Sequence, residues 1–155
     1  MTKTKYEELT DLEKLNKQWH KLSGLHSREE WSSAIVRAAT AAEIAANFAI
    51  REEFKLKSEF DSAFINSLLR WANGLAGKID RLLIPLSASA PDKFKSMKSL
   101  QKVAQNINLK RNAVAHQGEF CNEGEAKKII EQTREFISKL IKLYEPTFEL
   151  RERKR

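Results

Sequence analysis

The sequence predicts an all-α fold, an antiparallel bundle of about five helices. Only five glycines and three prolines occur among 155 residues, too few for a loop-rich or all-β chain. Apolar residues recur at spacings of three and four along most of the chain, which is the period of an amphipathic helix. Several segments also begin with a Thr, Ser or Asn three residues before a glutamate, a capping box that opens helices.

Length and composition indicate one soluble domain. The whole chain, 1–155, is expected to form it, with a core at about 10–145 and a basic C-terminal tail at 146–155, in which Arg151, Arg153, Lys154 and Arg155 are expected to be disordered. Cys121 is the single cysteine, so the chain suits the reducing cytoplasm. Neither a leader-like segment nor a run of 18 apolar residues occurs, so no membrane is expected as a partner.

Two helices are predicted in the first third of the chain. A capping box of Thr10 and Glu13 opens the first, which we expect to end at Gly24. A second capping box at Ser27 opens a helix that should run to about Phe54. This second helix is apolar on two faces and rich in alanine, so we expect it at the centre of the bundle.

Three further helices complete the prediction. The third should begin at Ser58 and end at Pro85, and Asn73-Gly74 could mark a kink in it. The fourth should start near Asp92, and the last should run from a capping box at Asn122 to the residue before Pro146. The apolar stripe expected of the third helix is Phe60, Phe64, Leu68, Trp71, Leu75, Ile79 and Leu82.

A short stretch at the end of the fourth helix gathers the side chains best suited to catalysis. On a helix, Asn112 and His116 share a face, and Arg111 lies about 100° away, within reach of both. Gly118 should end the helix in the left-handed conformation. Arginine holds phosphate through a fixed charge, and imidazole exchanges protons near neutral pH. This combination favours phosphodiester chemistry.

The pattern Arg111-Asn112-x-x-x-His116, in an all-helical chain, resembles the motif of the HEPN superfamily (higher eukaryotes and prokaryotes nucleotide-binding domains). The resemblance implies a HEPN-like bundle and a metal-independent endoribonuclease without a cofactor. The ribose 2′-hydroxyl would attack its own 3′-phosphate and leave a 2′,3′-cyclic phosphate. His116 would act as general base or acid, Arg111 would hold the phosphate, and Asn112 would orient His116 or the phosphate.

The resemblance also bears on partners and role. HEPN-like nucleases typically join two motifs in a homodimer, and toxin or phage-defence roles occur, with an antitoxin or regulatory protein as a candidate partner. A group of HEPN toxins carries a tyrosine two residues after the histidine, where this chain has Gly118, so control by tyrosine modification is not implied. Two alternatives stay open. The chain could be a non-catalytic module that binds RNA, nucleotide or protein, or Arg111 and His116 could be structural.

The charge distribution favours RNA as the partner. The net charge is +7 and the calculated pI is 9.5. Six Lys or Arg residues and no Asp or Glu occur from Lys93 to His116. A polar and basic stripe of the fourth helix leads toward the motif, and we predict RNA contacts from Lys98, Lys102, Gln105, Asn108 and Lys110. The alternative is a basic surface without a ligand.

Glu43 is predicted to support the site. It lies within an apolar face of the second helix, where a carboxylate needs a partner. We predict that Glu43 pairs with Arg111 and supports the site in this way. The alternative is a surface glutamate paired with Arg37 or Asn47. The sequence shows no metal-ligand pattern, so no metal site is predicted.

Overall fold

A computed structural model describes residues 6–27, 30–57, 62–71 and 74–151, and within these ranges the chain is helical and has no strand. The all-α prediction is therefore confirmed. In chain order the elements are the 3₁₀-helix η1 (Tyr6–Glu8), α1 (Asp11–Ser27), α2 (Trp31–Lys57), α3 (Ser62–Trp71), α4 (Leu75–Lys78), the π-helix η2 (Ile79–Leu83), α5 (Ile84–Leu86), α6 (Pro91–His116) and α7 (Glu123–Lys142).

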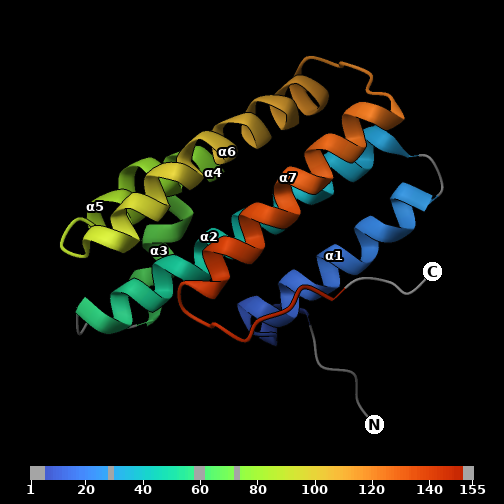
Figure 1. Cartoon of the computed structure of the whole chain (residues 1–155). Coiled ribbons are helices and arrows are strands. Elements are labelled where there is room, and N and C mark those ends of the chain that lie inside the picture. The colour runs from blue at the N-terminus through green and yellow to red at the C-terminus, as the bar shows by residue number, and fades with distance from the viewer. Residues whose placement is uncertain (1–5, 28–29, 58–61, 72–73, 152–155) are drawn as a thin grey trace, which may run out of the picture.

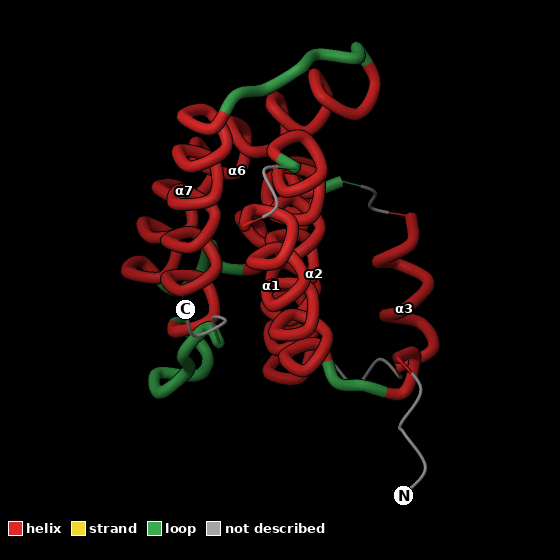
Figure 2. The backbone as a smooth tube through the Cα atoms, turned by 90° about the vertical axis from the view of Figure 1, so that its right-hand side faces the viewer, coloured by secondary structure: helices red, strands yellow, loops and turns green. Residues whose placement is uncertain are grey.

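The long helix α2 lies at the centre and contacts α1, α4, α6 and α7. Helices α1 and α2 run antiparallel, as do α6 and α7, and the C-terminal ends of α1 and α6 lie at the same end of the bundle as the N-terminal ends of α2 and α7 (Figure 1). Helix α3 stands apart from the other helices, on the side of α2 that faces away from α7 (Figure 2). The motif at the end of α6 therefore lies at the end of the bundle where the 117–122 loop and the start of α2 are found.

Alanine makes the central position of α2 possible, because small side chains let neighbouring helices approach closely. Seven alanines of α2 are fully buried: Ala34, Ala38, Ala41, Ala42, Ala45, Ala46 and Ala49. The segment Trp31–Leu56 is also long and apolar enough to cross a membrane by length and composition, and 61% of its most apolar stretch is buried inside the bundle. The buried core helix of a soluble protein meets the same criterion.

The capping box of α1 is confirmed. The backbone N–H of Glu13 donates to the Thr10 Oγ1, and the Thr10 N–H donates to the Glu13 Oε1, both at 3.2 Å. The predicted end at Gly24 is wrong, because α1 continues to Ser27. Leu25, beyond the glycine, packs on the core and offsets the roughly 1 kcal/mol that glycine costs inside a helix. The capping box proposed at Ser27 includes residues 28–29, which lie outside the described residues.

The third predicted helix is not one helix but α3 followed by α4, η2 and α5. Gly74 separates them with φ of 84°, a conformation that changes the chain direction and that favours glycine. The apolar stripe consequently does not continue across the break. Phe64 and Trp71, predicted to be buried, are 49% and 87% exposed, and Ile65 and Leu69 are buried in their place. Phe60 lies outside the described residues.

The predicted stop at Pro85 is also wrong, because Pro85 lies inside α5. In a regular α-helix the proline ring would collide with the carbonyl four residues earlier. The five residues before α5 form a π-turn, whose wider i→i+5 hydrogen bonding relieves this collision. The bundle thus has more helical segments than the five that we predicted.

The last two helices follow the prediction closely. Helix α6 is continuous over Pro91–His116, and Gly118 follows it with φ of 67°. The Asn122 side chain accepts a hydrogen bond of 2.9 Å from the Glu125 N–H and caps α7. The tail differs from the prediction, because Phe148 and Leu150 pack on the core and the Arg151 N–H donates to the Asn16 Oδ1 at 2.9 Å. Residues 152–155 lie outside the described residues.

Candidate functional site

The three side chains of the motif form one hydrogen-bonded cluster at the end of α6. The Arg111 Nη1 lies 2.8 Å from the His116 Nε2 and 3.2 Å from the Asn112 Oδ1. Arg111 and Asn112 are half-buried, and His116 is exposed. The local helix accounts for this arrangement, because residues five apart differ by about 140° around the axis and the long arginine spans the difference.

The direction of these hydrogen bonds assigns the tautomer of His116. A guanidinium has donors only, so the Nε2 accepts in this hydrogen bond, which corresponds to the tautomer with its proton on Nδ1. Both hydrogens of the Arg111 Nη1 are used by His116 and Asn112, which leaves the three N–H donors on Nη2 and Nε for an outside acceptor. Asn112 therefore orients Arg111 directly, whereas we had expected it to orient His116 or the phosphate.

Arg111 has no carboxylate within ion-pair distance among the described residues. A cavity of about 420 Å³ opens beside it, and Asn108, Arg111 and Asn112 of α6 line one wall. Glu43 and Thr40 of α2 line the opposite wall. The side chain thus presents a half-buried, uncompensated cation to a polar hollow, an arrangement suited to an anionic group.

Glu43 does reach this cavity, but its partner is not Arg111. The Lys78 Nζ lies 2.9 Å from the Glu43 Oε1. The Lys78 side chain is only 5% exposed, so its ammonium depends on this carboxylate for compensation. The alternatives are not its partners either: the Arg37 Nη1 donates to the Gln18 Oε1 at 2.7 Å, and the Asn47 Oδ1 is buried without a hydrogen-bond partner among the described residues. The charge of Glu43 is therefore balanced before any ligand arrives.

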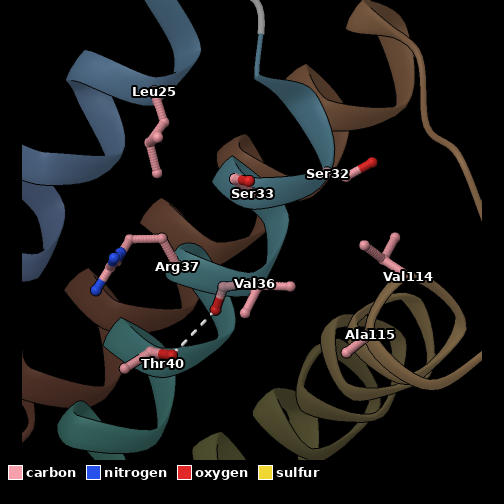
Figure 3. A pocket seen from close by; sticks show the side chains of 8 residues that line it. All are labelled: Leu25, Ser32, Ser33, Val36, Arg37, Thr40, Val114 and Ala115. Carbon is pink, nitrogen blue, oxygen red and sulfur yellow. Dashed lines mark hydrogen bonds between the residues drawn. The ribbon is translucent and has the colours of Figure 1, made fainter. Parts of the chain in front are cut away.

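A second cavity, of about 470 Å³, lies one turn further toward the end of α6, where Val114 and Ala115 face α2. Figure 3 shows these two side chains opposite Ser33, Val36 and Thr40, with the Arg37 side chain directed toward α1. The Thr40 hydroxyl donates to the Val36 carbonyl at 3.1 Å and lines both cavities. The last turns of α6 thus stand off α2 and leave hollows beside the motif.

Lys110 differs from the other predicted RNA contacts because it is held in ion pairs. Its ammonium bonds to the carboxylates of Glu119 and Glu125, and it ties the end of α6 to the 117–122 loop and to α7. The hydrogen bond to Glu119 and then the one to Glu125 raise the pKa of Lys110 above its ordinary value. With two carboxylates against one ammonium, this position offers no free positive charge.

The other four predicted contacts lie where the helical spacing puts them. Lys98, Lys102 and Gln105 are exposed on α6, and Asn108 is half-buried at the cavity beside Arg111. The Lys98 Nζ also lies 5.6 Å from the centre of the Phe94 ring. These residues lie on the same continuous helix as the motif.

Neither a metal cluster nor backbone capping by the motif is found in the described part of the chain. No group of three or more His, Cys, Asp or Glu side chains converges there. A purely structural role would require hydrogen bonds from the Arg111 and His116 side chains to the backbone. The described hydrogen bonds of these side chains instead join members of the motif to each other. The cluster keeps donors available at a solvent-accessible helix end.

Sequence reasoning missed several polar residues around the site. Lys78 and Thr40 lie on other elements, and no local pattern marks them as neighbours of Glu43 or of the motif. Glu119 and Glu125, which neutralise Lys110, were visible as an acid-rich stretch after the motif. That stretch could have indicated that the adjacent lysine would pair with it.

The fold and the site together define an all-helical bundle with an Arg-Asn-His cluster at the exposed end of one long helix. Comparisons with protein-family models, with curated proteins and with solved structures found no match.

Proposed function

We propose that this chain is a metal-independent endoribonuclease of the HEPN type, with Arg111, Asn112 and His116 as its catalytic cluster. The observation that carries the proposal is the 2.8 Å contact of the Arg111 Nη1 with the His116 Nε2, made by an arginine that no described carboxylate neutralises. An imidazole beside a free guanidinium supplies proton transfer and phosphate binding at one point.

The reaction follows from the hydrogen bonds of the cluster. A phosphodiester that enters takes the donors of Arg111, and this exchange releases the His116 Nε2 from the guanidinium. The Nε2 then accepts the proton of the ribose 2′-hydroxyl as its oxygen attacks the adjacent phosphorus. The bond from phosphorus to the 5′-oxygen breaks, and the products are a 2′,3′-cyclic phosphate and a 5′-hydroxyl. Arg111 stabilises the charge on the non-bridging oxygens.

A second proton donor is needed for the leaving 5′-oxygen, and a homodimer would supply it. One chain contributes a single histidine to the cluster. Two large apolar side chains next to the motif are exposed, Leu109 by 67% and Phe120 by 93%. Burial of these side chains against a second copy would favour an isologous contact that brings two motifs together. We therefore propose that the active form is a homodimer, located in the cytoplasm.

The decisive test is cleavage of labelled RNA by the purified protein in excess EDTA. Cleavage should persist, because the ribose supplies the nucleophile and the cluster supplies the acid–base groups. RNA with a single 2′-deoxyribose at the cleaved position should resist cleavage there while its other positions remain sensitive. Dependence on an added divalent cation, or cleavage at the deoxy position, would contradict the mechanism.

The exposed apolar side chains also favour a second candidate function, a non-catalytic module that binds a partner through this end of the bundle. Phe120 can stack on a base or enter a protein pocket as readily as it can meet a second copy. In that case Phe120→Ser would abolish partner capture, and the protein would cleave no RNA at any concentration. A toxin or phage-defence role with an antitoxin or regulatory partner remains part of the proposal under either function.

A further inference from the structure

A third cavity lies between the N-terminal half of α6 and the C-terminal end of α7, which run side by side (Figure 1). Its volume is about 520 Å³. Lys95 contributes from α6, and Lys139 and Lys142 contribute from α7. We call it the three-lysine pocket. It is separate from the two cavities that flank the motif, because none of their lining residues is shared with it.

The three-lysine pocket carries uncompensated positive charge. All three lysines are exposed, no carboxylate lines the pocket, and none of the three forms an ion pair within the described ranges. The nearest acids along these helices are Asp92, Glu135 and Glu145, which are exposed and do not line the pocket. Like charges gathered over one hollow repel each other, and a bound polyanion would relieve that repulsion.

The rest of the lining suits phosphates of a nucleic-acid strand. Ser96 and Ser99 add hydroxyl donors at the rim, and Leu100, which is only 4% exposed, forms the floor with Leu143. Lysine ammonium groups act as mobile point charges, which follow a flexible phosphate backbone well and do not impose the fixed geometry of a guanidinium fork. An apolar floor beneath them gives room for a base or a ribose.

Helix α6 connects this pocket with the motif. The helix is continuous from Ser99 to His116, a distance of roughly 25 Å at 1.5 Å per residue. Lys98, Lys102 and Gln105 lie exposed between these two points. We propose that the three-lysine pocket binds backbone phosphates of the same single-stranded RNA whose scissile nucleotide lies at Arg111 and His116. This inference rests on the proposed function and extends it, because it defines the path of the substrate.

The test measures binding and not cleavage, so that its failure is distinct from failure of the proposed function. Wild type is compared with the triple variant Lys95→Gln, Lys139→Gln, Lys142→Gln, using fluorescent 2′-O-methyl RNA of about 16 nucleotides, which cannot be cleaved by this route. Loss of three phosphate contacts should lower the slope of log K against log salt by about 2 and weaken binding at least about tenfold at 0.1 M salt.

The matched control removes the same charge elsewhere. Lys17, Lys21 and Lys128 are exposed, and within the described ranges they have no ion pair, so their triple change to Gln should leave the slope near that of wild type. Equal losses in the two triple variants would mean that only net charge matters and would overturn the proposal. The proposal would also be overturned if the Lys95/Lys139/Lys142 variant bound RNA as wild type does but no longer bound anionic lipid vesicles.

The shared path is tested by the length of the RNA. A dinucleotide cannot span roughly 25 Å, so competition by a dinucleotide at the motif should not differ between wild type and the Lys95/Lys139/Lys142 variant. The 16-nucleotide RNA should differ by the amount given above. An equal loss for both lengths would contradict a strand that runs from the pocket to the motif. Binding by a wild type that cleaves no RNA would refute the nuclease and leave the pocket standing.

Discussion

Arg111 is the residue on which the candidate site depends most, because one of its nitrogens contacts both other members of the cluster. The Nη1 donates to the Asn112 Oδ1 and to the His116 Nε2, and the side chain also lines a cavity. An ammonium group has three hydrogens at a single point and cannot form the same two bonds while also spreading along a phosphate. The side chain therefore organises the site as well as charging it.

His116→Ala should reduce RNA cleavage about a hundredfold or more, the usual scale for the loss of a proton-transfer group. The exposed position of His116 means that the melting temperature should change little. Initial cleavage rates and thermal melting would be measured together. His20→Ala, at an exposed position of α1, is the matched control and should cleave at the wild-type rate. A variant that unfolds would indicate a structural histidine.

Arg111→Lys keeps the charge and should still lower cleavage at least about tenfold, because an ammonium group cannot reproduce the bidentate hydrogen bonds of a guanidinium to phosphate. Cleavage kinetics at saturating RNA would show the effect in the rate of the chemical step. The control is Lys102→Arg, which replaces a lysine by an arginine on the exposed face of α6 and shows how such an exchange alone affects RNA binding. Wild-type rates for Arg111→Lys would contradict the double role.

At the scale of elements, two ion pairs attach neighbouring segments to the two halves of α2. Glu43 holds the buried Lys78 at the end of α4, beside the motif. Glu53, which is 0% exposed, holds Lys93 at the start of α6 with an Nζ to Oε1 distance of 2.8 Å. The wall of the cavity beside Arg111 therefore depends on the Glu43 pair.

Glu43→Gln should destabilise the protein by about 1–3 kcal/mol, since it leaves the Lys78 ammonium buried without its anion. The half-exposed carboxylate keeps the cost below that of a fully buried pair. Urea denaturation would give the difference in unfolding free energy. Glu52→Gln, on the same helix and paired with the exposed Lys55, should cost about 0.5 kcal/mol or less. Similar costs for the two variants would contradict the buried role of Lys78.

For the whole molecule, the end of the bundle remote from the motif is closed by Tyr144. Its hydroxyl donates to the Glu53 Oε1 at 2.8 Å, and its ring meets Phe48 edge to face at 6.3 Å between centroids. Burial, followed by the hydrogen bond to Glu53, raises the pKa of the Tyr144 phenol far above its ordinary value. The folded state therefore holds the phenolic proton more tightly than the unfolded chain does.

This difference predicts a loss of stability in alkali. The contribution of Tyr144 is complete below the pKa of about 10 of an unfolded tyrosine and declines as the pH rises above it. Tyr144→Phe should be less stable at pH 7, and its deficit relative to wild type should shrink above pH 10. Melting temperatures from pH 7 to 11 would test this. Tyr6→Phe is the control, and a constant deficit of the Tyr144 variant would contradict the argument.

Assembly is the second property of the whole molecule that can be tested. Excess His116→Ala subunits mixed with wild type under exchanging conditions should lower activity faster than dilution does, if each site combines groups of two copies. A surface variant such as Lys128→Gln mixed in the same ratio is the control and should dilute activity proportionally. Strictly proportional loss with His116→Ala, or full activity of a monomer in sedimentation, would sink the composite site.

The sequence by itself determined the helical class, the capping box at Thr10, the N-cap at Asn122, and the shared position of the motif side chains before Gly118. These features depend on hydrogen bonds and contacts that span about five residues, so local patterns predict them. The break at Gly74 was visible as a candidate kink, but the rotation of α3 that exposes Trp71 was not.

Only the tertiary structure decided which distant charges meet. Lys78 instead of Arg111 pairs with Glu43, and Lys110 pairs with Glu125 of α7 as well as with Glu119. These pairings join positions far apart in the chain, and each depends on how whole helices rotate and pack. A buried charge takes the partner that packing brings within reach, because leaving it unpaired would cost several kcal/mol, on the order of a large share of the stability of a domain.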